Sequence, residues 1–343
     1  IRLLLDLGFS ACPVTAAAMC ARLARRPTEF SMSSVPARPS SNLAAWRHAF
    51  RLRTLPLAAA CILLGSGLAG LQGGGSWRIG LLALLTTFLL QILANLANDY
   101  GDTLHGADGP LRIGPPRAMQ QGWIQPAAMR RAIALCGLLA ALSGAALLLL
   151  AWPAMADWGR WFWPLAGLLA IAAALAYTLG PRPYAYAGLG DLAVLVFFGL
   201  LGTLGSYALQ APVAPQWPWW PALALGLLSV GVLNLNNLRD WQADAAAGKR
   251  TLVVRLGVRS GRRYQLFLLL GADALWALQA VLQDGRWTWL ALLLLPAHVR
   301  LWRRLSWLAE GELDAELPWL AKLVLLQVGL FICGAWLDSG TAL

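Results

Sequence analysis

The sequence is dominated by a succession of apolar stretches, each about long enough to cross a bilayer. They lie at 54–72, 79–100, 127–151, 161–179, 188–209, 219–239, 263–283, 287–302 and 319–338. A helix needs about 20 mostly apolar residues to cross the hydrocarbon core of a membrane. Of the 343 residues, 59% are hydrophobic and 13% are charged, which excludes a soluble domain of ordinary composition. We therefore expect an all-α, polytopic membrane protein with about nine transmembrane helices.

The distribution of basic residues predicts how these helices are oriented. The formal net charge is +11, which by itself is compatible with nucleic-acid binding. With the N-terminus inside, however, only Arg78, Arg160 and Arg286 of the 27 Lys and Arg residues fall on outer segments. Cytoplasmic loops of membrane proteins carry such an excess of bases. We predict an N-in, C-out protein of the cell (inner or plasma) membrane whose partner is the lipid bilayer and not nucleic acid.

Residues 1–42 differ in composition from the rest of the chain. They contain a weak apolar run, interrupted by Asp6 and Pro13, and a Ser/Pro-rich stretch from Ser31 to Ser41. Such a stretch is typical of a flexible segment. We expect 1–42 to be a disordered or non-native extension and 43–343 to form one membrane domain.

An acidic, amide-rich motif occurs twice, each time at the end of an apolar stretch. The first copy runs from Asn95 to Asp102, and the second runs from Asn234 to Asp240 and is followed by Asp244. The two copies end the second and the sixth apolar stretch, at the side predicted to be cytoplasmic. This spacing predicts a pseudo-repeat of two four-helix halves around a central cavity, plus one extra helix.

The residue types in the two motifs favour a metal site that holds a phosphorylated ligand. Asp99 and Asp102 are three positions apart and share one helix face, which Asn95 and Asn98 extend. The second motif offers the carboxylates of Asp240 and Asp244, with Asn236 one turn earlier. Mg²⁺ is typically held by a few carboxylates, water and the phosphate oxygens of the substrate. We predict Asp99, Asp102, Asp240 and Asp244 as metal ligands.

Basic residues follow both motifs and suit a diphosphate. They are Arg112 and Arg117 after the first copy, and Arg239 and Lys249 in and after the second. Metal and bases together would stabilise a departing diphosphate and so ease the breaking of an allylic C–O bond. The competing interpretation is that the acids are helix caps and solvated loop charges. A transporter is a further alternative, although its acids should lie nearer the membrane midplane.

Beyond the two motifs, the sequence resembles the UbiA superfamily of intramembrane prenyltransferases over roughly 50–338. Within it, the likeness is to the 1,4-dihydroxy-2-naphthoate polyprenyltransferase branch. The stretches that carry it are 53–57, 90–102, 112–115 with Met119 and Gln120, Tyr177 and Thr178, 182–191, 196–199, 234–240 and 248–257. They occur in order and with plausible spacing.

The resemblance implies an activity and a set of site residues. The implied reaction transfers a polyprenyl group from its diphosphate to 1,4-dihydroxy-2-naphthoate, with release of diphosphate and CO₂, and gives demethylmenaquinol with Mg²⁺ as cofactor. The residues that match the diphosphate and acceptor motifs are Asn95, Asn98, Asp99, Asp102, Arg112, Arg117, Asn236, Asp240, Asp244 and Lys249. Asn237 stands where the first motif has Asp99, so the second half is expected to supply fewer metal ligands. A 4-hydroxybenzoate or other aromatic prenyltransferase is the alternative within the superfamily.

Three further polar residues in the apolar stretches need an explanation. Tyr184 is predicted to bind substrate, and Asp191 near it either orients or deprotonates the acceptor or caps the helix that begins there. Asp273 lies in the middle of an apolar stretch outside any motif, so we expect it to be a buried hydrogen-bond partner. His298 lacks any partner that the sequence identifies.

Overall fold

The computed structural model describes residues 41–107, 112–211 and 217–340. This part of the chain is helical, without a strand, as the all-α prediction requires. The predicted extension 1–42 lies outside the described residues except for its last two. Ser41 and Asn42 begin the first helix, because the Ser41 side chain caps it by accepting a hydrogen bond from the Ala44 N–H.

Long helices make up most of the described chain. In order, the elements are α2 (Asn42–Phe50), η2 (Leu52–Thr54), α3 (Leu55–Leu71), α4 (Trp77–Leu104), α5 (Pro126–Ala151), η3 (Trp152–Ala154), α6 (Asp157–Ala176), α7 (Gly190–Val194), η4 (Leu195–Gly202), α8 (Thr203–Ala208), α9 (Trp219–Ala246), α10 (Leu252–Leu256), α11 (Val258–Leu282), η5 (Thr288–Leu294), α12 (Leu295–Leu305), η6 (Glu310–Glu312) and α13 (Leu313–Gly340). Within the described ranges, 8 helical segments are long and apolar enough to cross a membrane. The protein is therefore a multi-pass membrane protein.

The eighth predicted span, 287–302, is divided between two shorter elements. The 3₁₀ segment η5 is followed directly by α12, so neither is long enough to count as a span by itself. Pro296, in the first turn of α12, has no N–H to donate to the preceding turn, which explains why the α-helix starts only there. The orientation of the spans stays a prediction.

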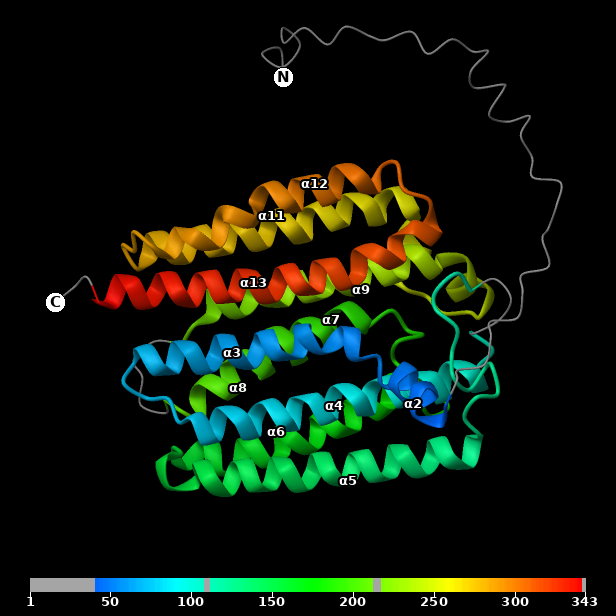
Figure 1. The fold of residues 1–343 in the computed structure, drawn as a ribbon, viewed down its shortest axis with the longest axis horizontal. Helices are drawn as coiled ribbons and strands as arrows, with labels where there is room; N and C mark the ends of the chain where they lie inside the picture. The colour runs from blue at the N-terminus through cyan, green and yellow to red at the C-terminus, as the bar shows by residue number, and fades with distance from the viewer. Residues whose placement is uncertain (1–40, 108–111, 212–216, 341–343) are drawn as a thin grey trace, which may run out of the picture. The chain divides into compact units, whose positions relative to one another are not determined.

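The helices lie side by side, with their connections gathered at two ends (Figure 1). α4 packs along α5, and α9 packs along α11, while α3 contacts α4, α8, α9 and α13. These two helix pairs occupy corresponding places in the predicted repeat of four-helix halves. The end of the bundle that holds α2 and the connections after α4 and α9 is also where both acidic motifs end.

A buried polar cluster joins three helices away from these motifs. Asp273 of α11 accepts a hydrogen bond from Gln327 of α13 at 3.0 Å, and its other oxygen lies 2.9 Å from Nδ1 of His298 on α12. All three side chains are buried. The expectation for Asp273 is confirmed. The sequence identifies no partner for His298, because 25 residues separate it from Asp273 and only the packing of α12 on α11 joins them.

A π-helical segment brings the middle of the fifth span close to α9. In η4, a Cβ added to Gly199 would lie 2.7 Å from the Gly226 Cα atom and 2.9 Å from the Ala222 carbonyl oxygen. Both are backbone atoms, so a side chain at Gly199 would force the two helices apart. The absence of a side chain is therefore what allows this close approach.

We expect Gly199→Val to lower the free energy of unfolding by about 1–3 kcal/mol, because overpacking strains backbone that cannot move aside. Thermal unfolding of the detergent-solubilised protein, followed by tryptophan fluorescence, measures this loss. Gly329→Val on α13 is the matched control, since a Cβ there meets no atom within 4 Å. An equal change in the two variants would contradict the close packing of η4 on α9.

Candidate active site

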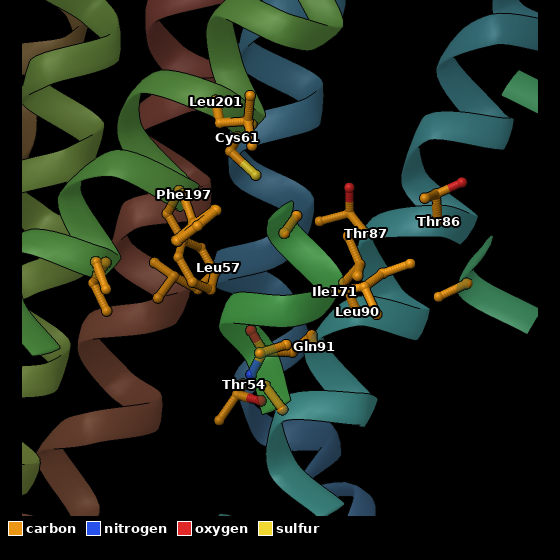
Figure 2. Close-up of a pocket in the computed structure, with 18 of the residues that line it drawn as sticks. Thr54, Leu57, Cys61, Thr86, Thr87, Leu90, Gln91, Ile171, Phe197 and Leu201 are labelled. Carbon is orange, nitrogen blue, oxygen red and sulfur yellow. The ribbon is translucent and has the colours of Figure 1, made fainter. Parts of the chain in front are cut away.

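A long cavity of about 620 Å³ runs between the helices, from an apolar interior to a polar end. Its apolar walls include Leu57 of α3, Ile171 of α6 and Phe197 and Leu201 of η4 (Figure 2). Thr54 and Gln91 lie toward one end in this view, and Cys61 and Leu201 toward the other. The cavity therefore suits an elongated apolar molecule with a polar head.

The polar end of the cavity combines several of the predicted residues with a surplus of bases. Its polar and charged lining residues are Arg51, Arg53, Thr54, Gln91, Asn95, Asn98, Asp102, Arg117, Tyr177, Tyr184, Asn236, Asn237 and Lys249. Within the described ranges, the charged members of this lining are four bases and one acid. Such a lining favours an anionic head group.

Lys249 joins the two acidic motifs. Its Nζ lies 3.8 Å from an oxygen of Asp102 on α4 and 3.7 Å from an oxygen of Asp244 on α9. Asp102 also accepts hydrogen bonds from Arg117 at 3.3 Å and from the Tyr186 hydroxyl at 3.2 Å. Burial disfavours the ammonium form, but the two carboxylates outweigh it and raise the pKa of Lys249 above its ordinary value. The cation between the carboxylates is therefore permanent at neutral pH.

Asp240 belongs to a separate ion-pair cluster. One of its oxygens accepts hydrogen bonds from Nε of Arg239 at 3.0 Å and from the Gly114 N–H at 3.2 Å. The other accepts from Nη2 of Arg239 at 2.6 Å and lies 3.5 Å from Arg112. Asp240 thus ties the connection after α4 to α9. Its assignment as a metal ligand stays a prediction, as both of its oxygens are already paired.

Two further predicted acids are buried beside the cavity and not in its wall. Asp99 and Asp191 are 1% and 9% exposed, and neither is among the lining residues. Each has one buried oxygen without a hydrogen-bond partner among the described residues, as does Asp244. Asp191 lies in the first turn of α7, whose N-cap residue is Leu189 and provides no side-chain cap. The role of Asp191 toward an acceptor stays a prediction.

The predicted amide side chains contact neighbouring protein groups. Asn95 donates from Nδ2 to the Phe50 carbonyl at 2.9 Å and to the Thr54 hydroxyl at 3.2 Å, which fixes the chain between α2 and α3. Asn98 accepts from the Thr178 hydroxyl at 3.1 Å, while Asn236 accepts from Arg239. Of these contacts, only those of Asn95 use the amide N–H as a donor, a role that a carboxylate could not fill.

Tyr184, also predicted as a site residue, closes the same end of the cavity. Its hydroxyl donates to the Ala173 carbonyl at 2.9 Å, and its ring packs edge-on against Tyr177 with centroids 5.2 Å apart. Burial, together with Tyr177, raises the pKa of Tyr184, so its hydroxyl stays protonated at neutral pH. Tyr184 therefore contributes a neutral aromatic ring to the cavity wall and does not serve as a base there.

The donor set agrees with a magnesium ion that is only partly held by protein. Among the described residues, no group of three or more His, Cys, Asp or Glu side chains is arranged to hold a metal by itself. Asp102 and Asp244 nevertheless supply hard carboxylate oxygens on either side of the Lys249 ammonium group. One oxygen of Asp244 has no hydrogen-bond partner among the described residues. Since Mg²⁺ often completes its shell with water and substrate phosphate, these residues fit it.

Sequence reasoning missed several residues at this end of the cavity. Arg51, Arg53 and Gln91 line it but are not part of an acidic motif. Arg53 was noted as part of a matching stretch without a role. Asp314, at the start of α13, accepts hydrogen bonds from Arg53 and Arg239. No local signal identifies Asp314, since its partner Arg239 is 75 residues away in the sequence.

Comparison with known proteins identifies the family of the chain. Residues 58–326 match the UbiA prenyltransferase family. The chain belongs to the UbiA prenyltransferase family. It is therefore a prenyltransferase, and the resemblance seen in its sequence is confirmed.

Similar proteins and structures agree with this UbiA assignment. The chain is 45% identical to a 1,4-dihydroxy-2-naphthoate octaprenyltransferase of Escherichia coli, over 88% of this chain and 98% of the relative. It is 44% identical to the Haemophilus influenzae protein of the same name, over 73% and 81% of the two chains. Its fold matches a UbiA homologue from Archaeoglobus fulgidus, bound to DMAPP and Mg²⁺, with a TM-score of 0.54 at 17% identity, covering 82% of this chain and 98% of the other.

Proposed function

We propose that this UbiA-family enzyme transfers a polyprenyl group from polyprenyl diphosphate to 1,4-dihydroxy-2-naphthoate. Diphosphate and CO₂ are released and demethylmenaquinol is formed, a step of menaquinone biosynthesis. The observation that carries the proposal is a single cavity with a long apolar interior and a basic end at which Asp102, Asp244 and Lys249 meet. The two relatives named for this reaction support the choice of acceptor.

In the proposed mechanism, the polar end of the cavity holds the diphosphate. Lys249 and Arg117 face this end and offer charge-assisted hydrogen bonds to its oxygens. Asp102 and Asp244 would hold Mg²⁺, with Asp99 and Asp240 as the remaining predicted ligands. When bound, Mg²⁺ neutralises charge on the departing diphosphate. The bond between the prenyl carbon and the diphosphate oxygen then breaks, and its electrons leave with the diphosphate.

The apolar part of the cavity would hold the prenyl chain and exclude water from the carbon that becomes electron-poor. Its wall is formed largely by apolar side chains such as Phe197, Leu201 and Ile171. The electron-rich ring of the acceptor attacks it, a C–C bond forms and the acceptor carboxyl group leaves as CO₂. We place the polar end, and with it the active site, on the cytoplasmic face of the inner or plasma membrane, because the acidic motifs end at the side where the sequence predicts most of the basic residues to lie.

The proposal predicts a metal-dependent activity with a preferred acceptor. Purified protein, Mg²⁺ and a polyprenyl diphosphate should give a prenylated product from 1,4-dihydroxy-2-naphthoate, detected by mass spectrometry. Chelation by EDTA should abolish product formation and added Mg²⁺ should restore it, because the carboxylates and the diphosphate are all anions and repel each other unless a divalent cation lies between them. 4-Hydroxybenzoate, assayed in parallel, is the control acceptor. A preference for it would replace the naphthoate assignment and leave prenyl transfer intact.

A further inference from the structure

The buried guanidinium of Arg239 is shared by two carboxylates from different helices. Arg239 is 1% exposed, and its Nε and Nη2 atoms bind Asp240, the next residue along α9. Its Nη1 donates at 2.5 Å to Asp314 at the start of α13. A buried guanidinium has five donors and is costly to leave partly unpaired. Asp314 therefore completes the shell of Arg239 on the side that Asp240 does not reach.

Asp314 also contacts a base of the cavity wall. Its second oxygen accepts a hydrogen bond from Nη1 of Arg53 at 3.0 Å, and Arg53 lines the cavity. One carboxylate thus bridges a base of the cavity wall and the base that orients Asp240. Side chains of Asp314 and Arg53 are about one-third exposed, at 32% and 37%, so solvent can reach this link.

The connection between α4 and α5 is held by the same cluster. The Gly114 N–H donates to Asp240, and a Cβ at Gly114 would come within 2.6 Å of Nη2 of Arg239. The backbone at Gly114 therefore lies directly against this guanidinium. A shift of Arg239 would displace Asp240. Through Asp240 it would also displace the segment of the connection that presents Arg112 and Arg117 to the polar end of the cavity.

We propose that Asp314 is a positioning residue of the diphosphate site, acting through Arg239. It holds the guanidinium that fixes Asp240 and the Arg112–Arg117 segment, and it has no place in the cavity wall itself. Because it acts on the residues around the diphosphate and not on the aromatic acceptor, its loss weakens the binding of the prenyl diphosphate. This inference rests on the proposed prenyl transfer, and it goes beyond it by naming a residue outside both acidic motifs.

The test compares Asp314→Asn with Glu316→Gln in the full-length protein. Both changes remove one negative charge from the first turns of α13, but Glu316 pairs with Arg304, outside the cluster. Asp314→Asn should raise the KM for prenyl diphosphate about 10-fold and the KM for the acceptor much less, in line with coupling between contacting residues. Glu316→Gln should leave both KM values unchanged, although it can lower the melting temperature. Asp314→Glu should recover part of the lost affinity.

A double-mutant cycle separates positioning from a direct role. If Asp314 acts through Arg239, then Asp314→Asn in an Arg239→Gln background should cause no further rise in KM. Independent, multiplying effects would overturn the proposal, as would a wild-type KM in Asp314→Asn. Calorimetric binding of geranyl diphosphate with Mg²⁺ gives the same comparison without turnover. The binding test therefore still applies if the wild-type protein fails to prenylate the naphthoate, which would refute the proposed function alone.

Discussion

Replacing Asp102 by Asn is expected to lower kcat/KM for prenyl transfer by about 10²-fold or more, the size seen when one preorganised electrostatic partner of a transition state is lost. Among the described residues, Asp102 is the acid in the cavity lining. It pairs with Arg117 and Lys249 and accepts a hydrogen bond from the Tyr186 hydroxyl. Asn keeps the size of the side chain but removes its charge. The bases then lose the carboxylate that holds them, and in the proposed mechanism Mg²⁺ loses a ligand.

Steady-state kinetics at saturating Mg²⁺ measures this effect, and size-exclusion chromatography checks that the variant folds. Asp157→Asn is the control for losing one carboxylate, because Asp157 pairs with Arg160 on α6, where its side chain is 95% exposed. We expect wild-type kinetics in that control. An Asp102→Asn enzyme within about 3-fold of wild type, well short of the effect of a lost electrostatic partner, would remove Asp102 from the mechanism.

Replacing Lys249 by Gln should have a comparable effect for the opposite reason. Lys249 is the cation between Asp102 and Asp244, and all three side chains are buried. Without it, the negative charges of two neighbouring carboxylates are less compensated, and in the proposed mechanism the diphosphate loses a charge-assisted partner. Truncating one member of a buried charge pair costs about 2–5 kcal/mol, so we expect prenyl-diphosphate affinity to fall by at least about 30-fold.

Arg250 provides a matched control for Lys249. It is the next base in the chain, its side chain is exposed, and it is not part of the cavity lining. Arg250→Gln should therefore bind geranyl diphosphate as the wild type does, measured by calorimetry with Mg²⁺. Equal losses in the two variants would mean that the general positive charge of this end, and not the placement of Lys249, governs binding.

The parts of the site that could be predicted are those set by local spacing. The apolar stretches and the carboxylates at their ends follow from helical periodicity, so the positions of Asp102 on α4 and Asp244 on α9 were foreseeable. The separation of the two motifs by four spans also indicated that they would meet. Their meeting at Lys249 agrees with that expectation.

The parts that could not be predicted depend on contacts between distant segments. The pairing of Asp240 with the Gly114 N–H, 126 residues away, is set by the path of a Gly/Pro-rich connection that has no periodicity. Asp314 and His298 likewise acquire their partners only when α13 and α12 pack on α9 and α11. Pro296 is a local signal that could have predicted the interruption of the eighth apolar stretch. The apolar composition of that stretch, however, indicated a continuous span.

The most direct test of the account is the release of CO₂ from the acceptor. Purified protein should be incubated with 1,4-dihydroxy-2-naphthoate labelled with ¹⁴C in its carboxyl group, together with Mg²⁺ and a polyprenyl diphosphate. The account predicts that labelled CO₂ and diphosphate are released in equal amounts, that both require the metal and the prenyl donor, and that Lys249→Gln suppresses both. Diphosphate release without labelled CO₂, or prenylated product that retains the label, would contradict the proposed reaction.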